Sequence, residues 1–141
     1  MNMKNLSKNK GFTLIELMVV ITVIAILSTI ALFGIGKAQA SARDTSRQQI
    51  MNGVRAALER YYGDNQVYYT ATNNFCGLTT ALVAGTYLAA QPIDPQTKTA
   101  ICGTGNPVVG GATYTYVGAA QSYTLTLSKE SGGTNTFLSP Q

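Results

Sequence analysis

The feature that most constrains this chain is an uncharged, apolar stretch from Leu17 to Gly36, which one carboxylate, Glu16, immediately precedes. A stretch of about 20 apolar residues is long enough to cross a bilayer as a helix. A charged group at the bilayer centre costs roughly 2.5 to 3.5 kcal/mol, so a Glu16 inside the membrane needs a partner. The alternative places Glu16 at the edge of the apolar run, where it reaches the headgroups and favours the positive end of the helix.

The residues around this carboxylate form the string Lys10-Gly11-Phe12-Thr13-Leu14-Ile15-Glu16-Leu17. It resembles the processing site of type IV prepilins and of type II secretion pseudopilins. In that family a dedicated peptidase cuts after the glycine that matches Gly11, and the new amino terminus, which matches Phe12, is N-methylated. The resemblance implies that Glu16 pairs with the terminal amine of a neighbouring subunit's Phe12. Elementary electrostatics agrees, because opposite charges in an apolar filament core are tolerated only as a pair.

The resemblance also implies a fold and a set of partners. The expected fold class is α+β: a pilin fold in which a long N-terminal helix, membrane-spanning in its first half, packs on a small antiparallel sheet of about three strands. The expected partners are copies of the chain itself in a helical homopolymer, a prepilin peptidase, the pilus assembly machinery and the inner membrane before assembly. The expected location is the cytoplasmic membrane, as a single-pass protein, and then an extracellular pilus.

We predict five segments along the chain, each with its own role. They are a leader peptide that is removed (1–11), a transmembrane and filament-core helix (12–37), an amphipathic extension of that helix (38–63), a loop region (64–111) and the antiparallel sheet of a globular head (112–141).

Charge and composition exclude several classes of function. The formal net charge is +4, but Lys4, Lys8 and Lys10 lie in the predicted leader, and removing them leaves seven basic side chains against six acidic ones. No basic patch indicates nucleic-acid binding. The sequence has no histidine, no Gly-rich phosphate loop with its lysine and no closely spaced pair of carboxylates. These absences favour a structural protein without a cofactor over an enzyme.

The two cysteines, Cys76 and Cys102, favour a structural disulfide. They are too far apart for a redox CxxC pair, and without histidine they do not suggest a zinc site. A bond between them would close a loop of about 27 residues and stabilise the fold by roughly 3.5 kcal/mol in the chain-entropy model. It would also indicate an oxidising, extracytoplasmic compartment. Two independent free thiols are the alternative.

The apolar pattern continues past the membrane segment with helical spacing, which predicts one helix from Phe12 to Tyr62 with a stop at Gly63 and Asp64. Charged residues in this extension stand at ion-pair spacing, Asp44 with Arg47 and Arg55 with Glu59. The apolar residues that set the pattern are Ile50, Val54, Leu58, Tyr61 and Tyr62.

The first half of this helix departs from the family pattern at one place. Many family members carry a proline near the position of Phe33, whereas this chain has Gly34 and Gly36. Glycine in a helix interior costs about 1 kcal/mol relative to alanine, so these residues weaken the helix locally.

The region after Asp64 reads as loop, with a short helix predicted over Thr79–Leu88. Gln91–Pro95 resembles the proline and aspartate segment that precedes the sheet in many pilins and in major pseudopilins, where oxygen ligands hold calcium. In this chain Asp94 is the only acidic residue between Asp64 and Glu130. One carboxylate makes a poor calcium site, so no metal is predicted.

The C-terminal part alternates in the manner of β-strands. We predict strands over Thr113–Val117, Ser122–Ser128 and Thr134–Leu138, with a turn at Gly132 and Gly133. Leucine and tyrosine share one face of the second strand, while threonines occupy the other. The apolar face needs a cover, and the amphipathic half-helix is the available one. Tyr114 and Tyr116 are accordingly interpreted as cross-strand packing rather than as an adhesive patch.

The favoured function is therefore a structural subunit of a type IV pilus, and three alternatives stay open. The first is a major pseudopilin of a type II secretion system. The second is a secreted protein released by an ordinary signal peptidase, since Ala38-Gln39-Ala40 and Ala40-Ser41-Ala42 both fit its small-residue pattern. The third is a single-span binding protein that keeps Met1. The mature amino terminus distinguishes these possibilities.

Overall fold

A computed structural model describes residues 11–102 and 107–140. The predicted leader lies outside the described residues except for Gly11. The described chain has an α+β fold, which confirms the predicted class. Its elements, in order, are α1 (Leu14–Asn65), β1 (Ala71–Thr72), α2 (Phe75–Ala84), β2 (Val108–Val109), β3 (Ala112–Ala119), β4 (Ser122–Ser128) and β5 (Thr134–Leu138).

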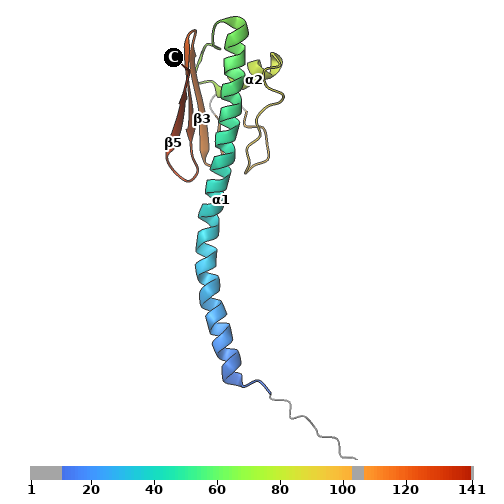
Figure 1. Cartoon of the computed structure of the whole chain (residues 1–141), viewed down its shortest axis with the longest axis vertical. Coiled ribbons are helices and arrows are strands. Elements are labelled where there is room, and N and C mark those ends of the chain that lie inside the picture. The colour runs from blue at the N-terminus through green and yellow to red at the C-terminus, as the bar shows by residue number, and fades with distance from the viewer. Residues whose placement is uncertain (1–10, 103–106, 141) are drawn as a thin grey trace, which may run out of the picture. The chain divides into compact units, whose positions relative to one another are not determined.

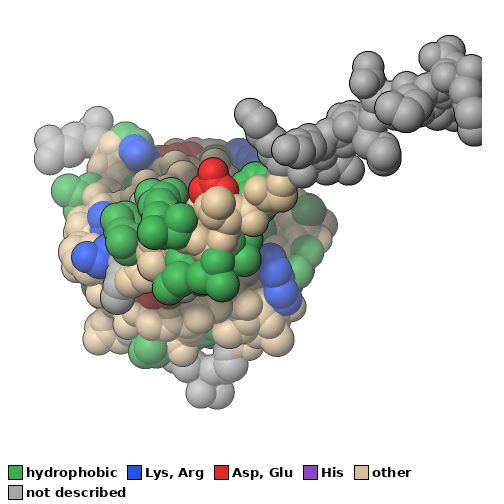
Figure 2. All heavy atoms as spheres, turned by 90° about the horizontal axis from the view of Figure 1, so that it is seen from below, with side chains coloured by type: hydrophobic (Ala, Val, Ile, Leu, Met, Phe, Trp, Pro, Cys, Tyr) green, Lys and Arg blue, Asp and Glu red, His purple; other side chains and the backbone are tan. Residues whose placement is uncertain are grey.

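The chain divides into two compact units, the first ending at Gly36 and the second beginning at Lys37. In the first unit the apolar side chains of α1 are exposed, with Leu14 at 76% and Ile30 at 69% of full accessibility. By length and composition α1 is able to cross a membrane. Figure 2 shows hydrophobic side chains gathered on the face toward the viewer, with an acidic side chain beside them. Apolar surface of this extent needs lipid or protein to cover it.

The ends of α1 differ from the predicted bounds of Phe12 and Tyr62. The helix begins at Leu14, because Thr13 precedes it in a capping position that is described below. It runs through Gly63 and Asp64 to Asn65, and Gln66 ends it with a φ of 58°. The Gln66 amide donates to the Tyr62 carbonyl at 2.8 Å, which closes the last turn. The predicted stop at Gly63 was wrong because one glycine lowers helix propensity without breaking the hydrogen-bond ladder.

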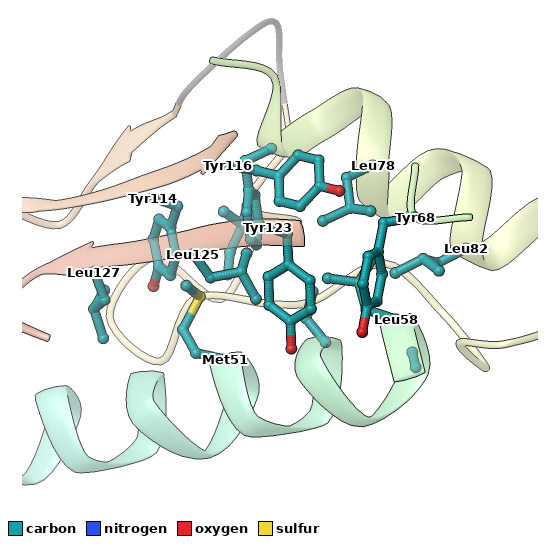
Figure 3. Close-up of a cluster of buried hydrophobic side chains, with 14 of the residues drawn as sticks. Met51, Leu58, Tyr68, Leu78, Leu82, Tyr114, Tyr116, Tyr123, Leu125 and Leu127 are labelled. Carbon is teal, nitrogen blue, oxygen red and sulfur yellow. The ribbon is translucent and has the colours of Figure 1, made fainter. Parts of the chain in front are cut away.

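The second unit, the head, has its core between α1, α2 and one face of the sheet. Met51, Val54 and Leu58 of α1 are almost completely buried, as are Leu78 and Leu82 of α2. Figure 3 shows Met51 of α1 and Leu78 of α2 on the same side as the side chains of the sheet. The buried sheet residues are Ala112, Tyr114, Tyr116, Tyr123, Leu125 and Leu127. The interpretation of Tyr114 and Tyr116 as packing residues is therefore confirmed.

The sheet is antiparallel, with the order β1-β3-β4-β5 and with β2 also paired to β3. The predicted bounds of β4 and β5 are confirmed, whereas β3 is longer than predicted and runs over Ala112–Ala119. β1 and β2 are two-residue strands inside the region predicted to be loop, so the described sheet has five strands rather than about three. In Figure 1 the sheet lies on one side of the C-terminal part of α1 and α2 on the other.

The helix α2 begins four residues before the predicted Thr79 and ends at Ala84. Asn74 caps it, since its side-chain oxygen accepts a hydrogen bond from the Gly77 amide at 2.7 Å. This start brings Phe75 and Leu82 onto the buried face together. Gly85 stands at the C-terminal cap, so the helix ends four residues before the predicted Leu88. Asn74 was the available sequence signal for the true start.

Candidate functional site

The first candidate site is the start of α1, where Glu16 and Thr13 form a capping box. The Glu16 Oε2 atom accepts hydrogen bonds from the Thr13 amide at 2.9 Å and from the Thr13 hydroxyl at 2.7 Å. The Glu16 amide donates in return to the Thr13 hydroxyl at 3.3 Å. This Ser/Thr-x-x-Glu arrangement satisfies backbone donors that the first helical turn leaves open. Within the described residues, no ion pair engages the carboxylate.

Glu16 lies in a shallow, largely apolar groove on the surface of the first unit. The groove has a volume of about 390 Å³. Its lining positions recur at the spacing of one helical face, so they form a continuous strip beside the carboxylate. Its lining residues are Phe12, Ile15, Glu16, Val19 and Val20. This strip combines one anionic group with exposed apolar surface, which is suited to a partner that is apolar and carries one cation.

Gly11 and Phe12 precede α1 in a segment without helix or strand structure. Phe12 is 86% exposed, and a Cβ added at Gly11 would meet nothing within 4 Å. The backbone between these two residues is therefore accessible in the described chain. Cleavage there and methylation of Phe12 stay predictions.

The two cysteines lie in the same neighbourhood of the head. Cys76 is buried on α2, and Cys102 is half-buried on the loop that follows. The Cys102 Sγ atom lies 3.0 Å from the Thr79 hydroxyl, and that hydroxyl donates to the Cys76 carbonyl at 3.3 Å. Thr79 thus lies against both residues, while the disulfide itself stays a prediction.

The second candidate site is a network around Arg47, a fully buried arginine on the head part of α1. Its Nε donates to Asp94 at 2.8 Å, and its Nη1 donates to Asp44 at 3.0 Å and to Glu130 at 2.9 Å. Its Nη2 donates to the Gly110 carbonyl at 3.3 Å. One guanidinium therefore connects α1 to the 92–101 loop, to the β2–β3 turn and to the β4–β5 turn.

The carboxylates of this network also hold backbone amides of the loops. Asp94 Oδ1 accepts from the amides of Gln96 and Thr97 at 2.8 and 3.2 Å. Asp44 accepts from the amides of Glu130 and Ser131 at 3.0 and 2.9 Å. Such charge-assisted bonds are stronger than neutral ones, so the loops are fixed by charged side chains as well as by apolar packing.

Gly110 is required where Arg47 meets the β2–β3 turn. It has a φ of 57°, and a Cβ there would approach the Arg47 Nη2 atom to 2.5 Å and the Gln96 side-chain oxygen to 2.2 Å. A larger residue would therefore displace the guanidinium in addition to straining the backbone.

The pKa values in the network follow from these contacts. Burial alone would raise the pKa of Asp94, but the Arg47 guanidinium and the amides of Gln96 and Thr97 outweigh it and lower that pKa. For Asp44, burial is likewise outweighed by Ser131, by the Glu130 amide and by Arg47, so its pKa is also lowered. Both carboxylates are therefore ionised at neutral pH and neutralise the buried arginine.

Only part of this network is predictable from the sequence. The Asp44–Arg47 pair was predicted from its spacing and is present at 3.0 Å. The sequence offers Asp94 only as a poor calcium ligand, whereas in the structure it accepts a hydrogen bond from Arg47. No group of three or more histidine, cysteine or acidic residues within the described ranges is arranged to hold a metal.

A second carboxylate of α1 contacts the sheet side of the head. Glu59 accepts hydrogen bonds from the hydroxyls of Tyr68 and Tyr123 at 2.9 and 2.6 Å.

Comparisons with known proteins agree with the amino-terminal motif. Residues 6–32 match the family described as the prokaryotic N-terminal methylation motif. Over 79 residues, or 56% of its length, the chain is 39% identical to the fimbrial protein EcpC of Eikenella corrodens. The aligned part spans 50% of that relative. No solved structure matches the chain.

The motif, the fold and this fimbrial relative all agree with the resemblance to type IV pilins and pseudopilins.

Proposed function

We propose that the chain is a structural subunit of a type IV pilus, which a prepilin peptidase cleaves between Gly11 and Phe12 and which then polymerises through the first part of α1. In this proposal the subunit waits in the cytoplasmic membrane and ends in an extracellular filament of identical copies. The relative named as a fimbrial protein supports a pilus over a secretion pseudopilin.

The observation that carries the proposal is the exposed apolar unit with one carboxylate at its start. Leu14, Ile15 and Leu17 are each more than 60% exposed, beside Glu16. Burying apolar surface stabilises by about 25 cal/mol per Å², so packing this unit among identical helices gives a large driving force for assembly. Because apolar contacts alone are not directional, a charge pair between Glu16 and the Phe12 amine of a neighbour would fix the register.

The experiment is mass spectrometry of the mature amino terminus in three fractions: membrane, periplasm and filaments sheared from the cell surface. We expect an N-methylated Phe12 in the sheared fraction. Methylated Phe12 confined to the cell would indicate a pseudopilin. A terminus at Ser41 or Arg43, or an intact Met1, would contradict pilin processing altogether.

A matched pair of glycine variants tests the cleavage position. Gly11→Val is expected to leave an uncut precursor in the membrane, because the family peptidase requires a small residue before the cut. Gly53→Val places the same side chain on an open position of α1, where an added Cβ meets nothing within 4 Å, and is expected to be cleaved normally. Equal processing of both variants would place the cut elsewhere.

A further inference from the structure

Three loops of the head meet α1 at the level of Arg47. The 92–101 loop, the β2–β3 turn and the β4–β5 turn each supply an oxygen that accepts a hydrogen bond from its guanidinium. The two turns also lie side by side, since a Cβ added at Gly111 would lie 3.5 Å from the Glu130 Cγ atom. We call this end of the head the base, and it consists of residues 37–47, 92–101, 108–111 and 129–133.

The base has an excess of positive charge, whereas the rest of the described head has none. Its side chains include five cations and three carboxylates, a net charge of +2. Each of the three carboxylates accepts hydrogen bonds from Arg43 or Arg47, so these carboxylates neutralise the two arginines. In the remaining described part of the head the charged side chains are Arg55, Arg60, Glu59 and Asp64, which balance one another.

Three lysines of the base carry the excess charge. Lys37 and Lys98 are exposed and Lys129 is half-exposed, and no ion pair within the described residues engages any of them. Lys98 has a φ of 58°, and its amide donates to the Asp94 carbonyl at 3.0 Å, so it stands at the tip of a closed turn. A soluble anion or an anionic surface can therefore reach these ammonium groups.

Two large aliphatic side chains are exposed beside the lysines. Ile93 is 57% exposed and directly precedes Asp94, while Val108 is 70% exposed and stands two residues before Gly110. Exposed apolar side chains combined with lysines are typical of surfaces that bind a membrane interface. The apolar groups enter the boundary between headgroups and acyl chains, and the lysines attract anionic headgroups.

The opposite end of the head provides a comparison. It also exposes aliphatic side chains, Val67, Val117 and Leu138. They have no excess of cations beside them, because the charges outside the base cancel. The two parts of a membrane-binding surface therefore coincide at the base and not at the other end of the described head.

Chain connectivity keeps the base close to a membrane that α1 crosses. The apolar stretch ends at Gly36, and Lys37 is the first residue of the head. Arg47 follows eleven residues later, about 16 Å along the helix. The headgroup layer covers about 5 to 7 Å of this distance. The remaining 10 Å or so is close to one Debye length in physiological salt, and the usual helix tilt of about 20° lowers one side of the head further.

We propose that the base of the head docks on anionic phospholipid headgroups while the subunit waits in the membrane. The inference rests on the membrane stage of the proposed function. Each lysine near an anionic leaflet favours the docked head about fivefold, and insertion of Ile93 and Val108 at the interface adds to this. Free phosphate offers nothing to these apolar groups, and the base has no aromatic ring on which a nucleic-acid base would stack.

The experiment uses an introduced tryptophan, because the chain has none of its own. Val108→Trp places an indole in the base, and Val67→Trp places one at the opposite end as the control. The full, uncleaved chain is incorporated into nanodiscs of brominated phosphatidylcholine, with or without phosphatidylglycerol, and quenching of the indole is measured. We expect Val108→Trp to be quenched several times more strongly than Val67→Trp, only with phosphatidylglycerol, and less at high salt. Equal quenching of the two variants, or equal quenching in the two lipids, would overturn the proposal.

Charge variants test whether the lysines are responsible. In the Val108→Trp chain, Lys98→Gln and Lys129→Gln should each lower the ratio of docked to undocked heads about fivefold. Arg60→Gln removes an exposed cation of α1 outside the base and should leave quenching unchanged. Near-ultraviolet circular dichroism verifies that each variant is folded, and Ile93→Trp replaces Val108→Trp as the probe if the latter is not. Equal quenching after Lys98→Gln and Arg60→Gln would overturn the proposal.

A last arm distinguishes a nucleic-acid surface from a lipid surface. Fluorescent duplex DNA is added to nanodiscs that carry the wild-type chain and lack phosphatidylglycerol, and its anisotropy is measured. We expect no more binding than to empty discs. Binding that Lys98→Gln abolishes would identify a nucleic-acid surface and overturn the proposal. None of these measurements requires cleavage or filaments, so their failure would leave the result for the mature amino terminus unaffected.

Discussion

The two parts of α1 differ in where their charged side chains find counter-ions. In the head part, Arg47 is fully buried and donates to carboxylates from three different segments of the same chain. In the first unit, Glu16 has only Thr13, three residues away, among its described partners. The same helix thus contains Arg47, whose counter-ions come from the head, and Glu16, for which the described residues supply no counter-ion.

The apolar residues differ in the same way. Met51 and Leu58 are fully buried in the head, whereas Leu14 and Ile30 are 76% and 69% exposed. The head buries its own apolar residues, whereas the apolar surface of the first unit needs lipid or protein to cover it. This difference indicates that substitutions in the first unit should affect assembly, while substitutions in the head should affect stability.

The largest effect is expected for Glu16→Ala, which should be inserted and cleaved normally but should fail to form filaments. Insertion should be unharmed, because removing a carboxylate lowers the cost of placing this segment in lipid. Assembly would leave the Phe12 amine of a neighbour without its counter-charge, at about 3 to 5 kcal/mol per subunit, so filament yield should fall about 100-fold or more. Leader cleavage on a gel and the sheared filament fraction of the same cells provide the measurement.

Two further variants sharpen the Glu16 prediction. Glu16→Lys should be worse than Glu16→Ala, because it sets two cations against each other. Ser28→Ala is the control in the same unit, since its hydroxyl donates only to the Ile24 carbonyl of its own helix. Filaments at wild-type yield from Glu16→Ala would show that Glu16 is only a capping residue at the membrane edge.

The next largest effect is expected for Arg47→Ala, which should destabilise the head by about 3 to 5 kcal/mol because it leaves Asp44 and Asp94 buried without a cation. The measurement is urea unfolding of the full chain in detergent, followed by near-ultraviolet circular dichroism. All eight tyrosines lie between Tyr61 and Tyr123, so this signal reports on the head alone. Arg60→Ala, at an exposed position of the same helix, should change stability by less than about 0.5 kcal/mol. Similar losses for both variants would contradict the role of the network.

The Arg47 network also shows where prediction from the sequence reaches its limit. Spacing reveals partners within one helix, so the Asp44–Arg47 pair was predictable. Asp94 lies 47 residues from Arg47 and Glu130 lies 83 residues away, and no local pattern connects them. A long-range pair of this kind depends on how the loops return to the helix.

Strand bounds and helix caps were predictable where their sequence signals are local. The bounds of β4 and β5 follow from strict alternation and from the turn at Gly132 and Gly133, which have φ values of 97° and 83°. The two-residue strands β1 and β2 are too short to show an alternating sequence pattern, and they form because they pair with β3. The capping box of Thr13 has a local signature, Thr-x-x-Glu, and was predictable from the sequence, although the prediction for Glu16 used only its charge.

The third prediction concerns the cysteines. Exported, non-reduced protein should resist thiol alkylation at Cys76 and Cys102, and reduction should lower the unfolding free energy by about 3.5 kcal/mol for a closed loop of about 27 residues. The double variant Cys76→Ala/Cys102→Ala is the control, because its stability should not respond to reductant. Alkylation of both cysteines in the non-reduced wild type would contradict the disulfide.

The fourth prediction is a loss of stability in acid that originates in the head. Because Asp44 and Asp94 have lowered pKa values in the folded chain, their contribution is present above the unfolded value of about 3.9 and is lost as the pH falls through the folded values. Asp94→Asn should be less stable than wild type at pH 7, and the difference should narrow steadily below about pH 4. Unfolding curves at a series of pH values measure it. A difference that stays constant down to pH 2 would contradict the ionised network.

The smallest effect is expected at Thr13, which determines how well the first unit presents Glu16 to a partner. The Thr13 hydroxyl donates to Glu16 Oε2 and accepts from the Glu16 amide, so Thr13→Val removes both contacts while keeping a similar shape. Loss of such a cap costs about 1 kcal/mol and would let the first turn of the helix fray, which should reduce filament yield severalfold while leaving cleavage intact. Thr13→Ser keeps the hydroxyl and should restore the yield. Because the Thr13 amide still bonds to the carboxylate in both variants, the effect should stay well below that of Glu16→Ala. If Thr13→Val and Glu16→Ala reduced filaments equally, the capping box itself, and not a charge pair between subunits, would be the function of Glu16.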